Sequence, residues 1–166
     1  MSFLFDPEKL KLDAQRAEKS TSQWISSFKR KDASRLDVVI HSLHTKAFDK
    51  VNCLLCANCC KNISPTLYDK DIERLARSMR IKPFEFIEKY LKIDEDNDYV
   101  FRKTTCPFLA DDNYCSVYEN RPKACREYPH TNRSRFYQIL KLTQKNTFVC
   151  PAAFMVMEGL KKTWKK

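Results

Sequence analysis

Glycine is almost absent from this chain: Gly159 is the single glycine among its 166 residues. Phosphate-binding loops use glycine because it lets the backbone approach the phosphate closely, so neither a G-x-G-x-x-G loop nor a P-loop can be formed here. A nucleophile elbow of the G-x-S-x-G type needs glycines that the chain also lacks. The composition therefore excludes the common glycine-dependent nucleotide-binding and hydrolase classes.

Long apolar runs and a secretory signal are also missing. The longest apolar run near the end of the chain, residues 152–157, is far shorter than the roughly 20 residues that span a bilayer. Residues 1–7 lack the basic region and apolar run that mark a secretory signal. We therefore expect a cytoplasmic protein with no membrane partner. In that reducing compartment cysteines bind metal or do redox chemistry more often than they form disulfides.

Basic residues are in excess and unevenly distributed. The formal net charge is +10, and residues 101–166 contribute 13 basic and 5 acidic side chains to it. A basic surface of this kind suits nucleic acid, and it equally suits a protein that houses an anionic metal–thiolate centre. Nucleic acid is therefore an alternative partner, beside an unidentified protein partner or substrate.

Hydrophobic periodicity predicts a mainly helical chain. Asp6 before Pro7 is typical of a helix start, because a capping side chain precedes proline at the first helical position. Ser64-Pro65 predicts the start of another helix, whereas Tyr99–Phe101 indicates a short strand. Residues 134–143 fit either a helix or a strand.

Eight cysteines contrast with the single glycine, and half of them form the block Cys53-x-x-Cys56-x-x-Cys59-Cys60. Two-residue gaps let a turn direct successive thiolates toward a common centre, as at zinc and iron–sulfur sites. Adjacent side chains diverge, so Cys59 and Cys60 are expected to serve different metals, or one of them not to be a ligand. A thioredoxin-like redox pair at Cys53 and Cys56 is the weaker alternative, because no βαβ pattern surrounds them.

The second half of the chain supplies Cys106, Cys115, Cys125 and Cys150. Proline follows the first and the last of these and makes the chain leave the sulfur in a defined direction. Arg121 and Arg126 flank Cys125, where guanidinium groups would stabilise an anionic centre, and both are candidate cofactor-binding residues. The candidate metal ligands are Cys53, Cys56, Cys59, Cys60, Cys106, Cys115, Cys125 and Cys150.

These motifs resemble a known family. The first block, Cys106-Pro-Phe-Leu, the run Cys115-Ser-Val-Tyr-x-x-Arg-Pro-x-x-Cys-Arg-x-Tyr-Pro129 and Cys150 are similar to the CxxCxxCC cysteine-cluster family, also called YkgJ-like. The resemblance covers about residues 53–151 and implies a zinc- or iron-chelating domain, often labelled as containing an iron–sulfur cluster. Relatives include the flagellin lysine methylase, which implies a protein-modifying enzyme as one alternative.

The chain departs from the family pattern at two positions where glycine is common. Asn113 replaces one of these glycines, and asparagine tolerates the left-handed conformation at little cost. Ala57 replaces the other, which implies either that the first loop needs no positive φ there or that it accepts some strain. The set of candidate ligands is unaffected.

The spacing of the cysteines does not by itself distinguish zinc from an iron–sulfur cluster. Eight thiolates fit two zinc centres of four cysteines each, or one four-iron cluster with thiols to spare. The three-residue steps and the Cys-Pro pairs favour iron–sulfur, whereas the 45-residue gap between Cys60 and Cys106 suits zinc that cross-links two segments. The family resemblance favours iron–sulfur slightly.

The sequence thus predicts a metal-binding cysteine-cluster protein, with an iron–sulfur cluster or zinc held by cysteine thiolates and no assigned reaction. The alternatives are a zinc-stapled nucleic-acid-binding module and a lysine methylase-like enzyme. The predicted fold class is mainly α with a short β-hairpin, in one compact domain built around the metal centre. Its segments are an N-terminal helical segment, residues 1–52, the metal-binding domain, residues 53–151, and a C-terminal amphipathic helix packed on the same domain, residues 152–166.

Overall fold

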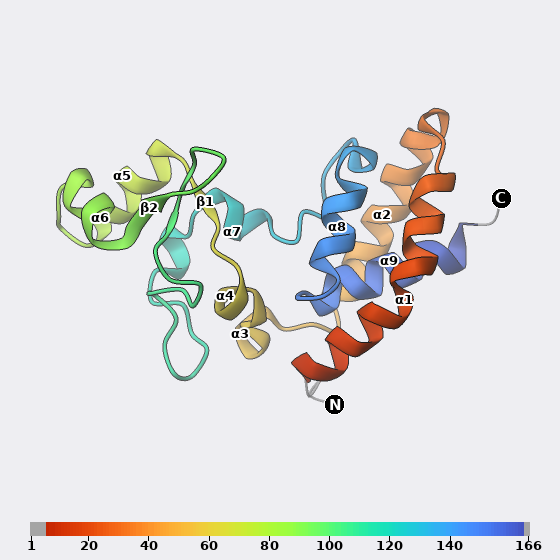
Figure 1. The fold of residues 1–166 in the computed structure, drawn as a ribbon, viewed down its shortest axis with the longest axis horizontal. Helices are drawn as coiled ribbons and strands as arrows, with labels where there is room; N and C mark the ends of the chain where they lie inside the picture. The colour runs from red at the N-terminus through yellow and green to blue at the C-terminus, as the bar shows by residue number, and fades with distance from the viewer. Residues whose placement is uncertain (1–5, 165–166) are drawn as a thin grey trace. The chain divides into compact units, whose positions relative to one another are not determined.

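The computed structural model describes residues 6–164. Residues 1–5, on which the expected lack of a secretory signal largely rests, and residues 165–166 lie outside the described part. The predicted mainly helical class is confirmed, with helices along most of the chain and a small antiparallel sheet (Figure 1). The contacts divide the chain into two compact units: unit 1 comprises Met1–Cys56 with Pro129–Lys166, and unit 2 comprises Ala57–Tyr128. The predicted three-segment division stays a prediction.

Unit 1 is helical, and Asp6 begins its first helix as predicted. The Asp6 carboxylate accepts hydrogen bonds from the backbone N–H groups of Glu8, at 3.0 Å, and Lys9, at 3.1 Å. The predicted C-terminal helix is also present, as α9 (Figure 1). The elements of unit 1 are α1 (Pro7–Ser27), η1 (Arg30–Asp32), α2 (Ala33–Phe48), α3 (Cys53–Cys56), η3 (Phe136–Ile139), α8 (Leu140–Asn146) and α9 (Pro151–Thr163), where η marks a 3₁₀ helix.

The single glycine lies where α9 packs against α2. Leu36 and Ile40 of α2 and Val156 and Leu160 of α9 are each at most 1% exposed. A Cβ atom at Gly159 would lie 2.6 Å from Cδ2 of Leu43, which is closer than van der Waals contact allows. The one glycine of this chain therefore serves helix packing rather than a loop.

Residues 134–143, which fit either a helix or a strand in the sequence, are mainly helical, as η3 followed by α8. Asp37 of α2 accepts hydrogen bonds from the backbone N–H groups of Arg135, at 2.7 Å, and Phe136, at 2.9 Å. The Phe136 side chain is completely buried. A contact with a distant helix thus anchors the start of this segment.

Unit 2 contains a three-stranded antiparallel sheet in the order β1-β3-β2. The strands are β1 (Thr66–Leu67), β2 (Leu91–Ile93) and β3 (Tyr99–Phe101). The predicted strand Tyr99–Phe101 is β3, and it forms an antiparallel hairpin with β2, with Leu91 opposite Phe101. The third strand, β1, was not predicted and pairs with β3 through Thr66 opposite Val100.

The prediction that Ser64-Pro65 begins a helix is wrong. Residues 66–67 are extended because they pair with β3, and the next helix, α5 (Asp69–Ser78), begins only after them. The Asp71 carboxylate accepts a hydrogen bond from the backbone N–H of Tyr68 at 3.2 Å, which caps this later start. Pairing with a strand far along the chain therefore overrides the local helix signal.

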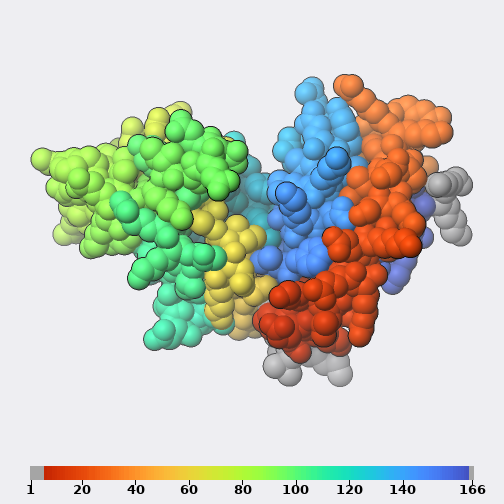
Figure 2. All heavy atoms as spheres, in the orientation of Figure 1, coloured from red at the N-terminus to blue at the C-terminus, as the bar shows by residue number. Residues whose placement is uncertain are grey.

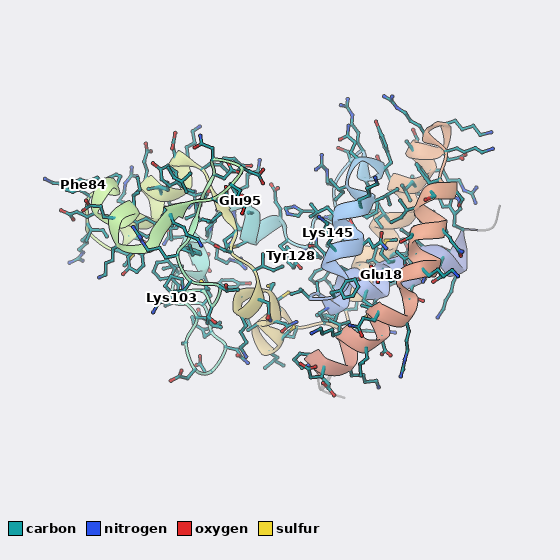
Figure 3. All side chains as sticks on the ribbon, in the orientation of Figure 1. Glu18, Phe84, Glu95, Lys103, Tyr128 and Lys145 are labelled. Atoms are coloured by element: carbon teal, nitrogen blue, oxygen red, sulfur yellow. The ribbon has the colours of Figure 1, made fainter. Side chains whose placement is uncertain are left out.

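The core of unit 2 is aromatic. The ring centroid of Phe108 lies 6.2 Å from that of Phe86, 5.2 Å from Tyr90 and 5.7 Å from Phe101. In contrast, Phe84 of α6 (Pro83–Tyr90) projects outward and is 55% exposed (Figure 3). The remaining elements of unit 2 are α4 (Asn58–Asn62), η2 (Tyr118–Asn120) and α7 (Lys123–Glu127). Over residues 6–164, none of the helices combines the length and the apolar character needed to span a bilayer.

Candidate metal centre

Five of the eight cysteines lie in unit 2, on two short helices and in the loop between β3 and η2. Cys59 and Cys60 are neighbours on α4, with their sulfur atoms 4.0 Å apart. Cys106 and Cys115 lie in the loop, and Cys125 lies on α7. The structure carries all eight cysteines as thiols.

A backbone hydrogen bond joins the two halves of the cysteine motif inside unit 2. The N–H of Cys106 donates to the carbonyl of Cys60 at 2.8 Å. Phe108, two residues beyond Cys106, is only 6% exposed and belongs to the aromatic core. The chain around Cys106 is therefore held on one side by α4 and on the other by the core.

Cys115 is held by the same stretch of loop. It forms an isolated antiparallel bridge with Leu109, and Ser116 donates to the Phe108 carbonyl from its N–H at 2.9 Å and from its hydroxyl at 3.1 Å. The turn between the two cysteines, residues 110–114, closes through Asn113, whose φ is 67°. This turn lies at the surface of unit 2 (Figure 2).

The approach to Cys125 is tied to α5 by two residues that the sequence analysis missed. Arg74 donates to the Arg121 carbonyl at 2.8 Å and to the Asn120 carbonyl at 3.4 Å. Asp71 accepts a hydrogen bond from the N–H of Lys123, the first residue of α7, at 3.1 Å. The only sequence signal is an aspartate three residues before an arginine, which on a helix is an ordinary ion-pair spacing.

The thiols of unit 2 affect one another electrostatically. Burial, together with smaller contributions from negative charge on Cys106, Cys60 and Cys115, raises the pKa of Cys125 to about 12. Burial likewise raises the pKa of Cys106 to about 11, with smaller contributions from Cys60 and Cys115. Burial also raises the pKa of Cys115. These four sulfurs therefore share one electrostatic environment, in which a bound cation would be stabilising.

Cys60 shifts in the opposite direction. The hydrogen bond with Cys59 lowers the pKa of Cys60 to about 7, against the effect of burial, and the positive charges of Arg121 and Lys61 add to the lowering. Hydrogen bonding and nearby cations both favour a thiolate.

Arg121 and Arg126, the predicted cofactor-binding arginines, have different surroundings. The Arg121 guanidinium lies 3.4 Å from the ring centroid of Tyr118, and its Nε donates to the Tyr118 carbonyl at 2.7 Å. Its charge lowers the pKa of Cys60, Cys115 and Cys125. Arg126 lies on α7 with its side chain exposed.

The other three cysteines lie in unit 1. Cys53 and Cys56 are the two ends of the single-turn helix α3, and Cys150 directly precedes Pro151 at the start of α9. Cys150 is only 7% exposed. Burial raises its pKa to about 12, with smaller contributions from negative charge on Cys53 and Cys56.

The thiols are chemically suitable metal ligands, but their sulfur atoms are not arranged in a metal-binding geometry. Among residues 6–164, no three His, Cys, Asp or Glu side chains are gathered closely enough to hold a metal ion as they stand. Zinc and iron both take thiolate sulfur readily, and unit 2 supplies five thiols. Ligation therefore requires the sulfurs to converge when the metal binds, as is common where metal binding is coupled to folding.

Comparison with known proteins identifies a matching family. The family model CxxCxxCC, described as "Putative zinc- or iron-chelating domain", matches residues 52–151, which is more than half of the chain. No curated protein matches the chain significantly, and no solved structure does. The matched range contains all eight cysteines and the two predicted cofactor-binding arginines, Arg121 and Arg126.

Proposed function

This chain belongs to the CxxCxxCC family of zinc- or iron-chelating domains, and on that premise we propose that it binds its metal as an iron–sulfur cluster held by cysteine thiolates. The centre that the geometry supports best comprises Cys60, Cys106, Cys115 and Cys125 of unit 2. The observation that carries this choice is the 2.8 Å hydrogen bond from the Cys106 N–H to the Cys60 carbonyl, which joins the two motif segments. When bound, such a cluster supplies one-electron transfer.

The surrounding residues have roles that follow from their own contacts. The aromatic core around Phe108 holds the Cys106 and Cys115 loop in place. Arg121 brings a fixed positive charge close to the thiols, since its guanidinium is held on the Tyr118 ring. A guanidinium beside an anionic cluster favours the reduced, more negative state and so raises its reduction potential.

Cys53, Cys56, Cys59 and Cys150 remain predicted ligands. The first, second and last of these belong to unit 1, whereas the four ligands proposed above belong to unit 2. We also infer that the protein works in the cytoplasm, because a reducing compartment keeps thiols available for metal. Its reaction, if it has one, is unassigned.

Metal analysis of anaerobically purified protein tests this proposal. We expect iron with acid-labile sulfide and a visible absorption band that air bleaches. Zinc without colour would overturn the preference for iron–sulfur but keep the metal-binding function. A folded, colourless protein without bound metal would overturn both.

Single substitutions identify the ligands. Replacement of Cys60, Cys106, Cys115 or Cys125 by alanine removes a ligand, so metal affinity should fall more than the roughly 10–100-fold typical of outer-shell changes. Thr104→Ala, at an exposed position in the loop that carries Cys106, removes a side-chain hydroxyl and no thiol, and serves as the control. Wild-type metal content in all four cysteine variants would reject this ligand set. The same measurement on Cys53, Cys56, Cys59 and Cys150 variants shows which of them bind metal.

A further inference from the structure

We propose that Asp71 and Arg74 of α5 are positioning residues for the metal centre: together they hold the segment Asn120–Lys123, which carries Arg121 and leads into Cys125. This inference rests on the proposed function, since it assigns a role at the four-thiol centre of unit 2. Neither residue is a thiol or lies within a cysteine motif, so the family pattern does not single them out.

Arg74 holds the segment by its backbone. Its guanidinium donates from Nη2 to the Arg121 carbonyl at 2.8 Å and from Nε to the Asn120 carbonyl at 3.4 Å. The planar guanidinium fork can bridge two neighbouring carbonyls at once, which a lysine ammonium does without the same fixed geometry. The identity of arginine at position 74 therefore matters beyond its charge.

Asp71 holds both Arg74 and the start of α7. Its Oδ1 accepts from Arg74 Nη2 at 2.6 Å and from the N–H of Lys123 at 3.1 Å, while its Oδ2 accepts from the N–H of Tyr68. Asp71 is only 2% exposed, so nearly all of its surface is shielded from water. A buried carboxylate needs these partners, and the loss of any of them leaves charge or a donor uncompensated.

This pair differs from an ordinary surface ion pair in the same chain. Asp13 and Arg16 of α1 have the same residue types and spacing, but their contact is 3.5 Å long and their side chains are 35% and 78% exposed. The corresponding exposures of Asp71 and Arg74 are 3% and 30%. Within the described residues, the contact of the first pair stays inside one helix turn, whereas the second pair bonds to residues about 50 positions away.

The segment Asn120–Lys123 determines the positions of two parts of the proposed centre, the Arg121 guanidinium and the Cys125 thiol. Arg121 extends from it over the Tyr118 ring, with its guanidinium 3.4 Å from the ring centroid. Lys123 is the first residue of α7, and Cys125 follows two positions later on this short helix. Movement of the segment away from α5 would therefore shift a proposed ligand and a fixed cation together.

The test compares how tightly the wild-type protein and matched variants bind metal. The wild-type protein and the variants Arg74→Lys and Asp71→Asn are purified anaerobically, and the release of bound iron or zinc to excess EDTA is followed with a colorimetric chelator. We expect both variants to hold metal roughly 10–100-fold more weakly, the usual effect of losing an outer-shell partner. Arg16→Lys and Asp13→Asn, which change the exposed pair in the same way, should behave as wild type.

Circular dichroism separates positioning from general destabilisation. Metal release is measured at temperatures at which each variant retains the wild-type helical signal. If Arg74→Lys is folded and holds metal as tightly as wild type, the positioning role is rejected, even if its melting temperature is lower. If Asp71→Asn does not fold, Arg74→Lys still decides, because it keeps the positive charge beside Asp71. A wild-type protein without bound metal would instead reject the proposed function on which this inference rests.

Discussion

At the scale of single residues, the thiols of unit 2 are not equivalent. The hydrogen bond with Cys59, 4.0 Å between sulfurs, and the cations Arg121 and Lys61 lower the pKa of Cys60 to about 7. Burial and neighbouring thiolates raise the pKa of Cys125 to about 12. The same side chain thus ionises at very different pH values within one unit, because its reactivity depends on what surrounds the sulfur.

Alkylation of the metal-free protein tests this difference. Because the thiolate is the nucleophile, Cys60 should react faster than Cys125 with iodoacetamide above pH 7, and the Cys60 rate should fall about tenfold for each pH unit below 7. Cys125 should stay largely unreactive up to pH 9. Peptide mapping by mass spectrometry measures both rates. Cys59→Ala removes the hydrogen-bonding partner and should shift the Cys60 profile to higher pH; identical profiles for Cys60 and Cys125 would contradict the assignment.

Non-glycine residues occupy the left-handed backbone conformation that glycine usually adopts at turns. Among residues 6–164, six non-glycine residues have positive φ: Ala57, Arg80, Asn97, Asn113, His130 and Arg135. The sequence left two alternatives for Ala57, and the structure selects strain, since its φ is 46° and it is only 3% exposed. Such a conformation costs an alanine roughly 1–2 kcal/mol. Asn113 adopts the glycine-like conformation that its side chain tolerates.

At the scale of elements, the turn between Cys106 and Cys115 depends on the left-handed backbone conformation of Asn113. The backbone N–H of Asn113 donates to the Ala110 carbonyl at 3.0 Å, and the N–H of Ala110 donates to the Tyr114 carbonyl at 2.9 Å. These bonds close a loop that brings Leu109 opposite Cys115. The turn therefore determines the path of the chain between two proposed ligands.

Substitutions at position 113 test the turn. Asn113→Val places a β-branched side chain at a φ of 67°, and should lower the free energy of unfolding by about 1–2 kcal/mol. Asn113→Gly keeps the conformation accessible and should change stability little. Urea unfolding followed by circular dichroism measures both variants. Equal stability of the valine and glycine variants would show that the turn tolerates another conformation.

Helices α1 and α5 differ in how far local sequence decides where they begin. Asp6 and Pro7 start α1, because the capping carboxylate and the proline act within one turn. The same reasoning fails at Ser64-Pro65, since β1 pairs with β3 there and delays α5 until Asp69. Local signals hold where no distant strand competes for the backbone hydrogen bonds.

At the scale of the whole molecule, the cysteines separate by unit. Cys53, Cys56 and Cys150 belong to unit 1, and the other five belong to unit 2. The division between the units falls between Cys56 and Ala57, inside the first cysteine block. The grouping of the cysteines by unit therefore does not follow their order in the chain. That Cys59 and Cys60 differ in role stays a prediction.

Metal removal should destabilise the folded protein. A ligand that binds only the folded state stabilises it by about 4 kcal/mol at a free concentration 1,000 times its Kd. For a chain of this size that corresponds to a melting temperature higher by roughly 10 °C. We expect this difference between metal-loaded protein and protein treated with EDTA, measured by circular dichroism, and recovery on reloading. Magnesium-saturated EDTA controls for effects of salt; equal melting temperatures after verified metal loss would contradict a coupled metal centre.

By itself the sequence determined the family, the mainly helical class, the capped start of α1 and the eight candidate ligands. These depend on spacing and on interactions within a few residues, which a linear pattern contains. Only the tertiary structure showed that Cys106 meets Cys60, that β1 pairs with β3, and that Asp71 and Arg74 hold the segment before Cys125. Such hydrogen bonds join residues about 35 to 50 positions apart, and they form only where packing of the core brings those segments together.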